Sequence, residues 1–225
     1  MNAQGKRSGE TAREYAYRMI REQVISLELK PGEAFNDMEF AAKIGVSRTP
    51  VREAVIQLSE ESRIIEIFPQ RGMRIAPIDV ELVEEARSLR VFLEKQIAGM
   101  CCEMATEEDI KWLQENVGLQ EFYMENSRPE MVMQLDDEMH HKLFMICHRE
   151  LTYGMCQKLA IHYDRIRSLS VNTVKDNTII EDHRKIIQFI AEHKKENAMA
   201  QMEKHLSRWQ LNEGKFRQEF PDYFK

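Results

Sequence analysis

One carboxylate and three imidazoles have the types and spacing that a divalent metal ion requires. Asp136 and His140 are four residues apart, so they lie on one face of a single helix. His183 and His205 fall on two later helical segments and would lie roughly level if these segments pack antiparallel about a turn near residue 195. The four side chains suit Zn²⁺, Ni²⁺, Mn²⁺ or Fe²⁺ in the core of a helical bundle. Histidines placed separately in the helices for structural reasons would give the same spacing, so both interpretations stand at this point.

A second group of side chains, at the start of a helical segment, has the chemistry that reads DNA. Arg48 and Arg52 are four residues apart and share one helix face. An arginine can donate two hydrogen bonds to guanine O6 and N7, which discriminates against other bases by ~1–3 kcal/mol. Ser47 and Thr49, together with the free amides of the helix start, suit phosphate oxygens.

The segments around these residues predict a winged helix-turn-helix over residues 10–77. Asn36 and Glu39 form a capping box before a short helix, and Gly45 supplies the turn before the next helix, which Ser47 caps. β-Prone segments then flank a turn, which predicts a hairpin wing able to approach a DNA backbone or minor groove. The residues at the tip of this hairpin are Gln70, Arg71 and Gly72.

Amphipathic helical patterns fill residues 78–220, where glycine and proline are sparse. They predict an all-α antiparallel bundle of about six helices. These helices are expected at about residues 80–103, 106–126, 129–148, 151–170, 176–193 and 196–218. Residues 1–9 are polar and expected to be disordered. The predicted fold class is therefore mainly α, with one small β-hairpin in the N-terminal domain.

The charge distribution agrees with this division of the chain. The net charge of −6 argues by itself against a nucleic-acid partner. Residues 1–77 carry 12 Lys and Arg against 11 Asp and Glu, whereas the rest of the chain carries 20 against 27. The N-terminal part is thus the more basic one, and local placement of a few arginines must account for DNA binding.

Cellular location and redox state follow from the apolar runs and the cysteines. No apolar run approaches the ~18 residues of a membrane span, and the polar start is not a secretory signal, so a cytoplasmic protein is expected. The four cysteines contain no CxxC pair. We expect reduced and mostly buried thiols, with a thiol redox switch as the alternative.

Residues 14–77 resemble the winged helix of the GntR family of regulators. The resemblance rests on Leu29-Lys30-Pro31-Gly32, on Gly45-Val46-Ser47-Arg48-Thr49-Pro50-Val51-Arg52-Glu53-Ala54, and on Gln70-Arg71-Gly72. It implies that Arg48 and Arg52 contact bases, that Ser47 and Thr49 contact the DNA backbone, and that the tip at 70–72 enters the minor groove. Some members carry a DNA-contacting arginine at the position that Met38 occupies here.

Residues 80–212 resemble the FCD sensing domain of the FadR subfamily. The resemblance rests on Arg90-Val91-Phe92-Leu93-Glu94, Asp136-x3-His140-x2-Leu143, Asp182-His183-x2-Ile186 and Met202-x2-His205-Leu206. It implies that a metal is bound by Asp136, His140, His183 and His205. It also implies a small carboxylate effector at the open metal positions, with Arg90 as a contact and with Arg165 and Arg167 as weaker candidates.

These observations favour a DNA-binding transcription regulator and not an enzyme. We expect a homodimeric repressor that binds a palindromic double-stranded operator and responds to a small organic acid bound near the metal. One alternative is a regulator in which the ion itself is the signal. Others are a metal-dependent hydrolase, for which no general base is evident beside the ligands, and a binding scaffold that does not read DNA.

Overall fold

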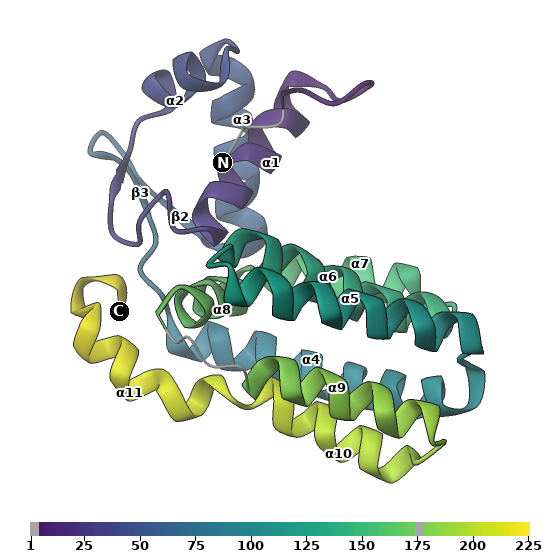
Figure 1. Cartoon of the computed structure of the whole chain (residues 1–225). Helices are drawn as coiled ribbons and strands as arrows, with labels where there is room; N and C mark the ends of the chain where they lie inside the picture. Colours follow the sequence, from purple (N-terminus) through teal and green to yellow (C-terminus); the bar gives the residue numbers. More distant parts are fainter. Residues whose placement is uncertain (1–4, 174–177) are drawn as a thin grey trace. The chain divides into compact units, whose positions relative to one another are not determined.

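The computed structural model describes residues 5–173 and 178–225, and folds them into helices with one small sheet (Figure 1). The chain divides into two units: Met1–Val80 with Phe220–Lys225, and Glu81–Glu219. The first unit holds the sheet and the second is helical, which confirms the predicted fold class. Residues 1–4 of the segment expected to be disordered lie outside the described residues, as do residues 174–177, where a helix is expected from about residue 176.

The described residues of the first unit form three α-helices, a short 3₁₀ helix (η1, Pro221–Tyr223) and a three-stranded antiparallel sheet. The helices are α1 (Ala12–Ile25), α2 (Asp37–Ile44) and α3 (Arg48–Ser62), and the strands are β1 (Ala34–Phe35), β2 (Ile65–Phe68) and β3 (Gly72–Ile75). The strand order is β1-β3-β2, with Ile65 opposite Ile75 and Phe68 opposite Gly72. The sequence predicts only the β2–β3 hairpin, because a strand of two residues is too short to show an alternating pattern.

The two ends of α2 depend on two residues. The side chain of Asn36 accepts hydrogen bonds from the amides of Met38 and Glu39, at 3.0 and 3.3 Å, and so begins α2. Gly45 ends α2 with φ of 73°, a left-handed conformation that glycine adopts without a steric penalty. Residues 45–47 join α2 to α3, and the start of α3 is exposed at the surface.

Helix α3 is held in place mainly by its packing on α1. Its inner face is apolar and buried, and so is the facing side of α1. The buried side chains are Ala16, Ile20 and Val24 of α1, and Val51, Ala54, Val55 and Leu58 of α3. The opposite face of α3 is therefore free to carry polar residues.

The second unit is a bundle of helices. Their bounds are α4 (Val80–Met104), α5 (Glu107–Glu125), α6 (Pro129–Ile146), α7 (Glu150–Leu159), α8 (Ile161–Thr173), α9 (Thr178–Ala191), α10 (Lys195–Leu206) and α11 (Trp209–Glu219). The prediction of about six helices is wrong at two places, since α7 and α8 divide at Ala160, and α10 and α11 divide after Leu206. The sequence does not show that a helix ends at Ala160, because the buried residues Cys156 and Ala160 keep the four-residue spacing of one continuous helix.

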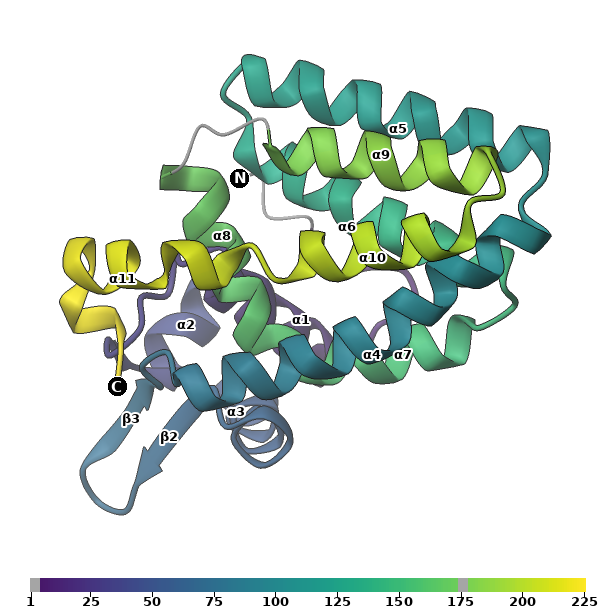
Figure 2. The same ribbon diagram turned by 90° about the horizontal axis from the view of Figure 1, so that it is seen from below.

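The core of the bundle lies among α4, α5, α6, α9 and α10. Helices α5 and α9 run side by side in Figure 2, and α6 packs on α5 while α10 packs on α9. At Gly99 of α4, an added Cβ would lie 2.9 Å from the sulfur of Met199, so the absence of a side chain allows α4 to approach α10 closely. The close packing of these helices brings residues far apart in the sequence to one point in the interior.

Residues 220–225 belong to the first unit, although they follow the last helix of the second. The amide of Ile78 donates a hydrogen bond to the carbonyl of Tyr223 at 2.7 Å, and the amide of Lys225 donates to the carbonyl of Ile78 at 3.0 Å. Lys225 Nζ also lies 3.0 Å from a carboxylate oxygen of Asp79. This segment therefore adds a short parallel bridge beside the linker that follows β3.

Two glycine substitutions should change the free energy of unfolding in opposite directions. Gly45→Ala should lower it by about 1 kcal/mol, because alanine is strained at the left-handed φ even though the space around it is open. Gly118→Ala should raise it by about 0.5–1 kcal/mol, because Gly118 lies exposed inside α5 and alanine loses less chain entropy there. Urea unfolding of both variants tests this; a stabilised Gly45→Ala would contradict the assigned turn.

Candidate metal centre and DNA-reading residues

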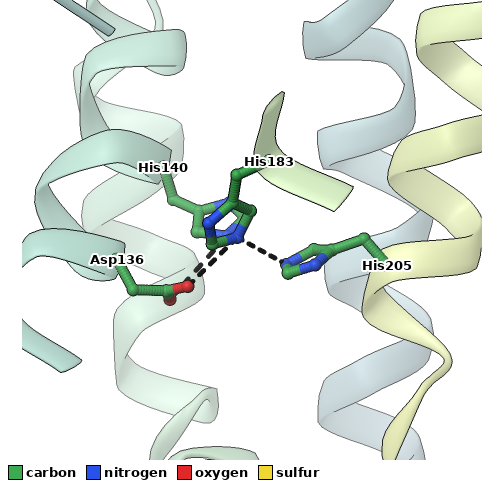
Figure 3. Close-up of side chains that lie close together, drawn as sticks. All are labelled: Asp136, His140, His183 and His205. Carbon is green, nitrogen blue, oxygen red and sulfur yellow. Dashed lines mark hydrogen bonds and ion pairs between the residues drawn. The ribbon is translucent and has the colours of Figure 1, made fainter. Parts of the chain in front are cut away.

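The four residues predicted as metal ligands come together inside the second unit. Asp136 and His140 extend from α6, His183 from α9 and His205 from α10, and all four are buried (Figure 3). One potential ligand atom from each lies within 4.8 Å of those of the other three. The structure thus brings the four side chains into one cluster, as a shared ion requires and as separately placed structural histidines would not.

Two distances within the cluster are close to those between ligands of one ion. His183 Nε2 lies 3.2 Å from Asp136 Oδ1 and 3.3 Å from His205 Nε2. Ligand atoms ~2.1 Å from a tetrahedral ion lie ~3.4 Å apart. His140 Nε2 is buried and has no hydrogen-bond partner among the described residues, which is costly unless an ion or a water satisfies it. These residues therefore fit a divalent ion such as Zn²⁺, Ni²⁺, Mn²⁺ or Fe²⁺.

Neighbouring polar side chains orient two of the imidazoles. His183 Nδ1 lies 2.8 Å from Gln120 Oε1, and the amide group of Gln120 is itself bonded to Asn116 Oδ1 at 2.7 Å. His140 Nδ1 lies 2.5 Å from Glu94 Oε2. A proton on Nδ1 leaves the lone pair on Nε2 for a metal, which is the usual arrangement behind a metal-bound histidine. Gln120 and Asn116 could not be predicted from the sequence, because an amide side chain in a helical pattern does not indicate which residue it faces.

The electrostatics keep the ligands in the state that binds metal. Burial alone would raise the pKa of Asp136, but Arg167 and the neighbouring histidines outweigh it and hold the pKa well below its usual range. Burial lowers the pKa of His183, and burial together with His183 and His140 lowers that of His205 well below its usual value. At neutral pH the carboxylate is therefore ionised and these two imidazoles are neutral, as metal binding requires.

A cavity of about 50 Å³ lies beside the cluster and shares Asp136 and His205 with it. Three arginines line it: Arg90 and Arg167, which are predicted effector contacts, and Arg208, which is not predicted from the sequence. Arg165, the third residue predicted to contact an effector, is fully buried and does not line the cavity, and burial lowers its pKa to about 10.

Carboxylates hold each of the three arginines in position. Arg90 Nε donates to Glu94 Oε1 at 2.6 Å, and Arg208 donates to Asp182. Arg167 pairs with Asp136, and it also donates to Asp137 at 2.8 Å and Asp164 at 2.7 Å. The ligand Asp136 and a cavity arginine are therefore parts of one network of charges.

The side chains predicted to read DNA lie together at the start of α3. Ser47, Arg48, Thr49 and Arg52 are all exposed. Arg48 Nε lies 3.0 Å from Asp37 Oδ1 of α2, whose side chain is 4% exposed, so the carboxylate restrains the arginine. The guanidinium has five N–H donors, so its terminal groups remain able to face a base edge. The contact between Asp37 and Arg48 could not be predicted from the sequence. An aspartate is common in the first turn of any helix, where it interacts with the helix dipole, so its presence does not indicate a partner.

The predicted tip of the wing is also exposed. The amide of Arg71 donates to the carbonyl of Phe68 at 3.0 Å, which closes the turn between β2 and β3. Gln70 and Gly72 have φ of 60° and 99° and so occupy left-handed positions. Gln70, Arg71 and Gly72 thus form a tight turn whose side chains face solvent.

A winged helix-turn-helix joined to a helical unit with a buried aspartate–histidine cluster defines a class of DNA-binding regulators. The family model described as "Bacterial regulatory proteins, gntR family" matches residues 12–75, and that of the FCD domain matches residues 85–208. The chain belongs to the GntR family of transcription regulators and carries an FCD domain. The prediction that it is not an enzyme is confirmed by this membership.

Known proteins of similar sequence and fold agree with this assignment. The chain is 28% identical to the HTH-type transcriptional repressor RspR of Escherichia coli, over 92% of this chain and 91% of that protein. It is 27% identical to the Nta operon transcriptional regulator of Aminobacter aminovorans, over 82% and 86%. The solved structure of E. coli McbR/YncC has the same fold, with a TM-score of 0.77 and 17% identity over 93% and 99% of the two chains. Among the described residues, no helix is both long and apolar enough to cross a bilayer.

Removing the partner of His183 should weaken metal binding without removing a ligand. Gln120→Leu should lower the affinity for Zn²⁺ about 10- to 100-fold, because His183 loses the group that orients its ring. Gln134→Leu, on the exposed face of α6, is the matched control and should leave the affinity unchanged. Competition with a chromogenic chelator measures both, and equal affinities in the two variants would contradict the role of Gln120.

Proposed function

We propose that this regulator is a repressor that binds a palindromic operator as a homodimer and releases or retains it according to a small carboxylate bound beside a divalent metal. The observation that carries the proposal is the buried Asp136–His140–His183–His205 cluster next to a cavity lined by arginines. An ion held there would offer positive charge and open coordination positions to an acidic ligand.

The surroundings of the cavity support an anionic and small occupant. Arg90 is buried, Arg167 is half-buried, and Arg208 also lines the cavity. Arginine binds the carboxylate of a ligand through two parallel hydrogen bonds. Acidic side chains of the protein already hold these guanidinium groups in place, so less side-chain entropy is lost when the ligand binds. A cavity of about 50 Å³ favours a short organic acid over a bulky one.

The DNA-binding half supports direct reading of bases at the major groove. Arg48 and Arg52 are exposed on one face of α3, with Ser47 and Thr49 beside them for phosphates. The exposed tip at Gln70–Gly72 is placed on a hairpin, as a wing requires. RspR, which this chain resembles, is a transcriptional repressor, and this supports the negative sign of regulation.

Metal and effector binding are tested together by metal analysis and thermal unfolding. We expect about one ion per chain in the purified protein and less than a tenth of that in His140→Ala. With the metal present, one member of a panel of short mono- and dicarboxylates should raise the melting temperature, since a ligand at 100 times its Kd stabilises the folded state by ~2.7 kcal/mol. The same acid should have no effect on protein stripped with a chelator.

Two other results would contradict this proposal in different ways. Absence of metal from the protein, with unchanged stability in His140→Ala and His205→Ala, would remove the metal site. DNA affinity that follows the concentration of metal alone, with no response to any acid, would assign the signal to the ion.

The base-reading residues are tested by alanine substitution. Arg48→Ala and Arg52→Ala should each weaken binding to the operator about 10- to 100-fold, as expected from the loss of ~1–3 kcal/mol of base discrimination. Arg63→Asn is the control: it removes one positive charge from the far end of α3, and asparagine tolerates the left-handed φ of 54° at that position. Fluorescence anisotropy with operator and scrambled DNA measures the change. Unaltered operator affinity in both alanine variants would refute the assigned contacts.

A further inference from the structure

Two of the four cysteines face each other between α4 and α6. All four are buried free thiols. Cys101 lies in α4 and Cys147 directly follows the last residue of α6, and their sulfur atoms are 3.5 Å apart. Neither residue belongs to the metal cluster or lines the cavity beside it. The function proposed above therefore gives this pair no role.

Reciprocal contacts hold the two thiols in the narrow space between the helices. Cys101 Sγ lies 3.4 Å from the carbonyl oxygen of Leu143, four residues before Cys147 in the chain. Cys147 Sγ lies 3.6 Å from the carbonyl oxygen of Ile97, four residues before Cys101. Each side chain thus extends to the helical turn in which the other cysteine lies. To form a disulfide, the two sulfur atoms must approach to ~2.05 Å, which is a movement of about 1.5 Å.

The contact makes the two thiols chemically unequal. The hydrogen bond from Cys101 lowers the pKa of the Cys147 thiol, and the charge of Arg149 lowers it further, against the opposing effect of burial. The same hydrogen bond, together with burial, raises the pKa of Cys101. The thiolate is the form that attacks an oxidant, so Cys147 is the more reactive of the two sulfur atoms.

Cys147 is also directly adjacent to exposed residues. His148 and Arg149, which follow it, are both exposed, and His148 has φ of 54° in the turn that separates α6 from α7. Exposed turns open locally at a lower free-energy cost than the helices beside them. A small oxidant such as hydrogen peroxide therefore has a short route to the sulfur of Cys147.

We propose that Cys101 and Cys147 are a redox-active pair, which a hydroperoxide oxidises to a disulfide. In the first step the Cys147 thiolate attacks hydrogen peroxide: an S–O bond forms, the O–O bond breaks, and the departing hydroxide takes up a proton and becomes water. In the second step the sulfur of Cys101 attacks that of the Cys147 sulfenic acid: the S–S bond forms, the S–O bond breaks, and the departing hydroxide leaves as water with the proton of Cys101. Two electrons pass from the thiols to the peroxide, which ends as two molecules of water.

The disulfide joins the two helices that carry the residues of the candidate sites. Helix α4 carries Arg90, which lines the cavity, and α6 carries the predicted ligands Asp136 and His140. Cys147 follows His140 by seven residues, which is two turns along the same helix face. Oxidation therefore fixes the separation of α4 and α6 two turns from a predicted metal ligand.

Oxidation of the Zn²⁺-loaded full chain tests the pair, since Zn²⁺ has no redox chemistry of its own. The protein is treated with hydrogen peroxide at a dose that fully oxidises free cysteine, the remaining thiols are alkylated in denaturant, and the tryptic peptides are analysed by mass spectrometry. Two of the four thiols should be lost, and peptides 96–111 and 143–149 should appear linked, two hydrogens lighter than their sum. Dithiothreitol should restore all four thiols. Retention of four thiols, or a disulfide between any other pair, would overturn the proposal.

Serine variants separate Cys101 from Cys102, because these two residues share one tryptic peptide. Cys102 is the matched control: it is equally buried, but its sulfur faces the carbonyl oxygens of Ala98 and Phe189, at 3.5 and 3.9 Å. Cys102→Ser should form the disulfide in the yield of the unaltered protein, whereas Cys101→Ser should form less than about a tenth of it. Circular dichroism confirms that both variants keep their helices. A disulfide that persists in Cys101→Ser and disappears in Cys102→Ser would refute the assignment of Cys101.

Trapping of the intermediate tests the order of attack. In Cys101→Ser the sulfenic acid on Cys147 loses the thiol with which it condenses, so dimedone should label Cys147 after peroxide treatment. In Cys147→Ser the label on Cys101 should be about tenfold lower, because Cys101 lies in the apolar core and is the less readily ionised thiol. Stronger labelling of Cys101 in Cys147→Ser than of Cys147 in Cys101→Ser would contradict the proposed order.

Discussion

The second unit depends on how the buried carboxylate of Asp136 is neutralised. A carboxylate away from water is strongly unfavourable unless charges and hydrogen-bond donors surround it. Here Arg167 comes from α8 and His183 from α9, while Asp136 itself is on α6. Three helices must therefore meet at one point for the charge to be tolerated. The same requirement that fixes the packing of these helices assembles the candidate metal centre.

Around this point, positive and negative side chains alternate. Arg90 pairs with Glu94, which in turn contacts His140, and Arg208 pairs with Asp182 next to His183. Buried networks of this kind contribute little net stability, and their benefit is that each group is held in one orientation. The arginines beside the cavity are thus held in place by the protein's own carboxylates.

The sequence predicted the parts of this arrangement that follow local rules. The four-residue spacing of Asp136 and His140 and the antiparallel return to His205 follow from helix geometry alone. The turn at Gly45 follows from the conformational preference of glycine. Arg208, Gln120 and the Arg48–Asp37 pair could not be predicted, because each depends on which helix faces are in contact. The helix ends at Ala160 and after Leu206 were not predicted either, because the apolar pattern on both sides of each is that of one continuous helix.

The bridge between Ile78 and residues 220–225 makes the second, helical unit an insertion within the DNA-binding unit. Synthesis runs from the N-terminus, so α1–α3 and the wing leave the ribosome first. The strand segment that pairs with their linker follows only after all of Glu81–Glu219. The DNA-binding unit is thus begun first and completed last. During translation, the backbone groups of Ile78 cannot form these two hydrogen bonds until residues 220–225 have been synthesised.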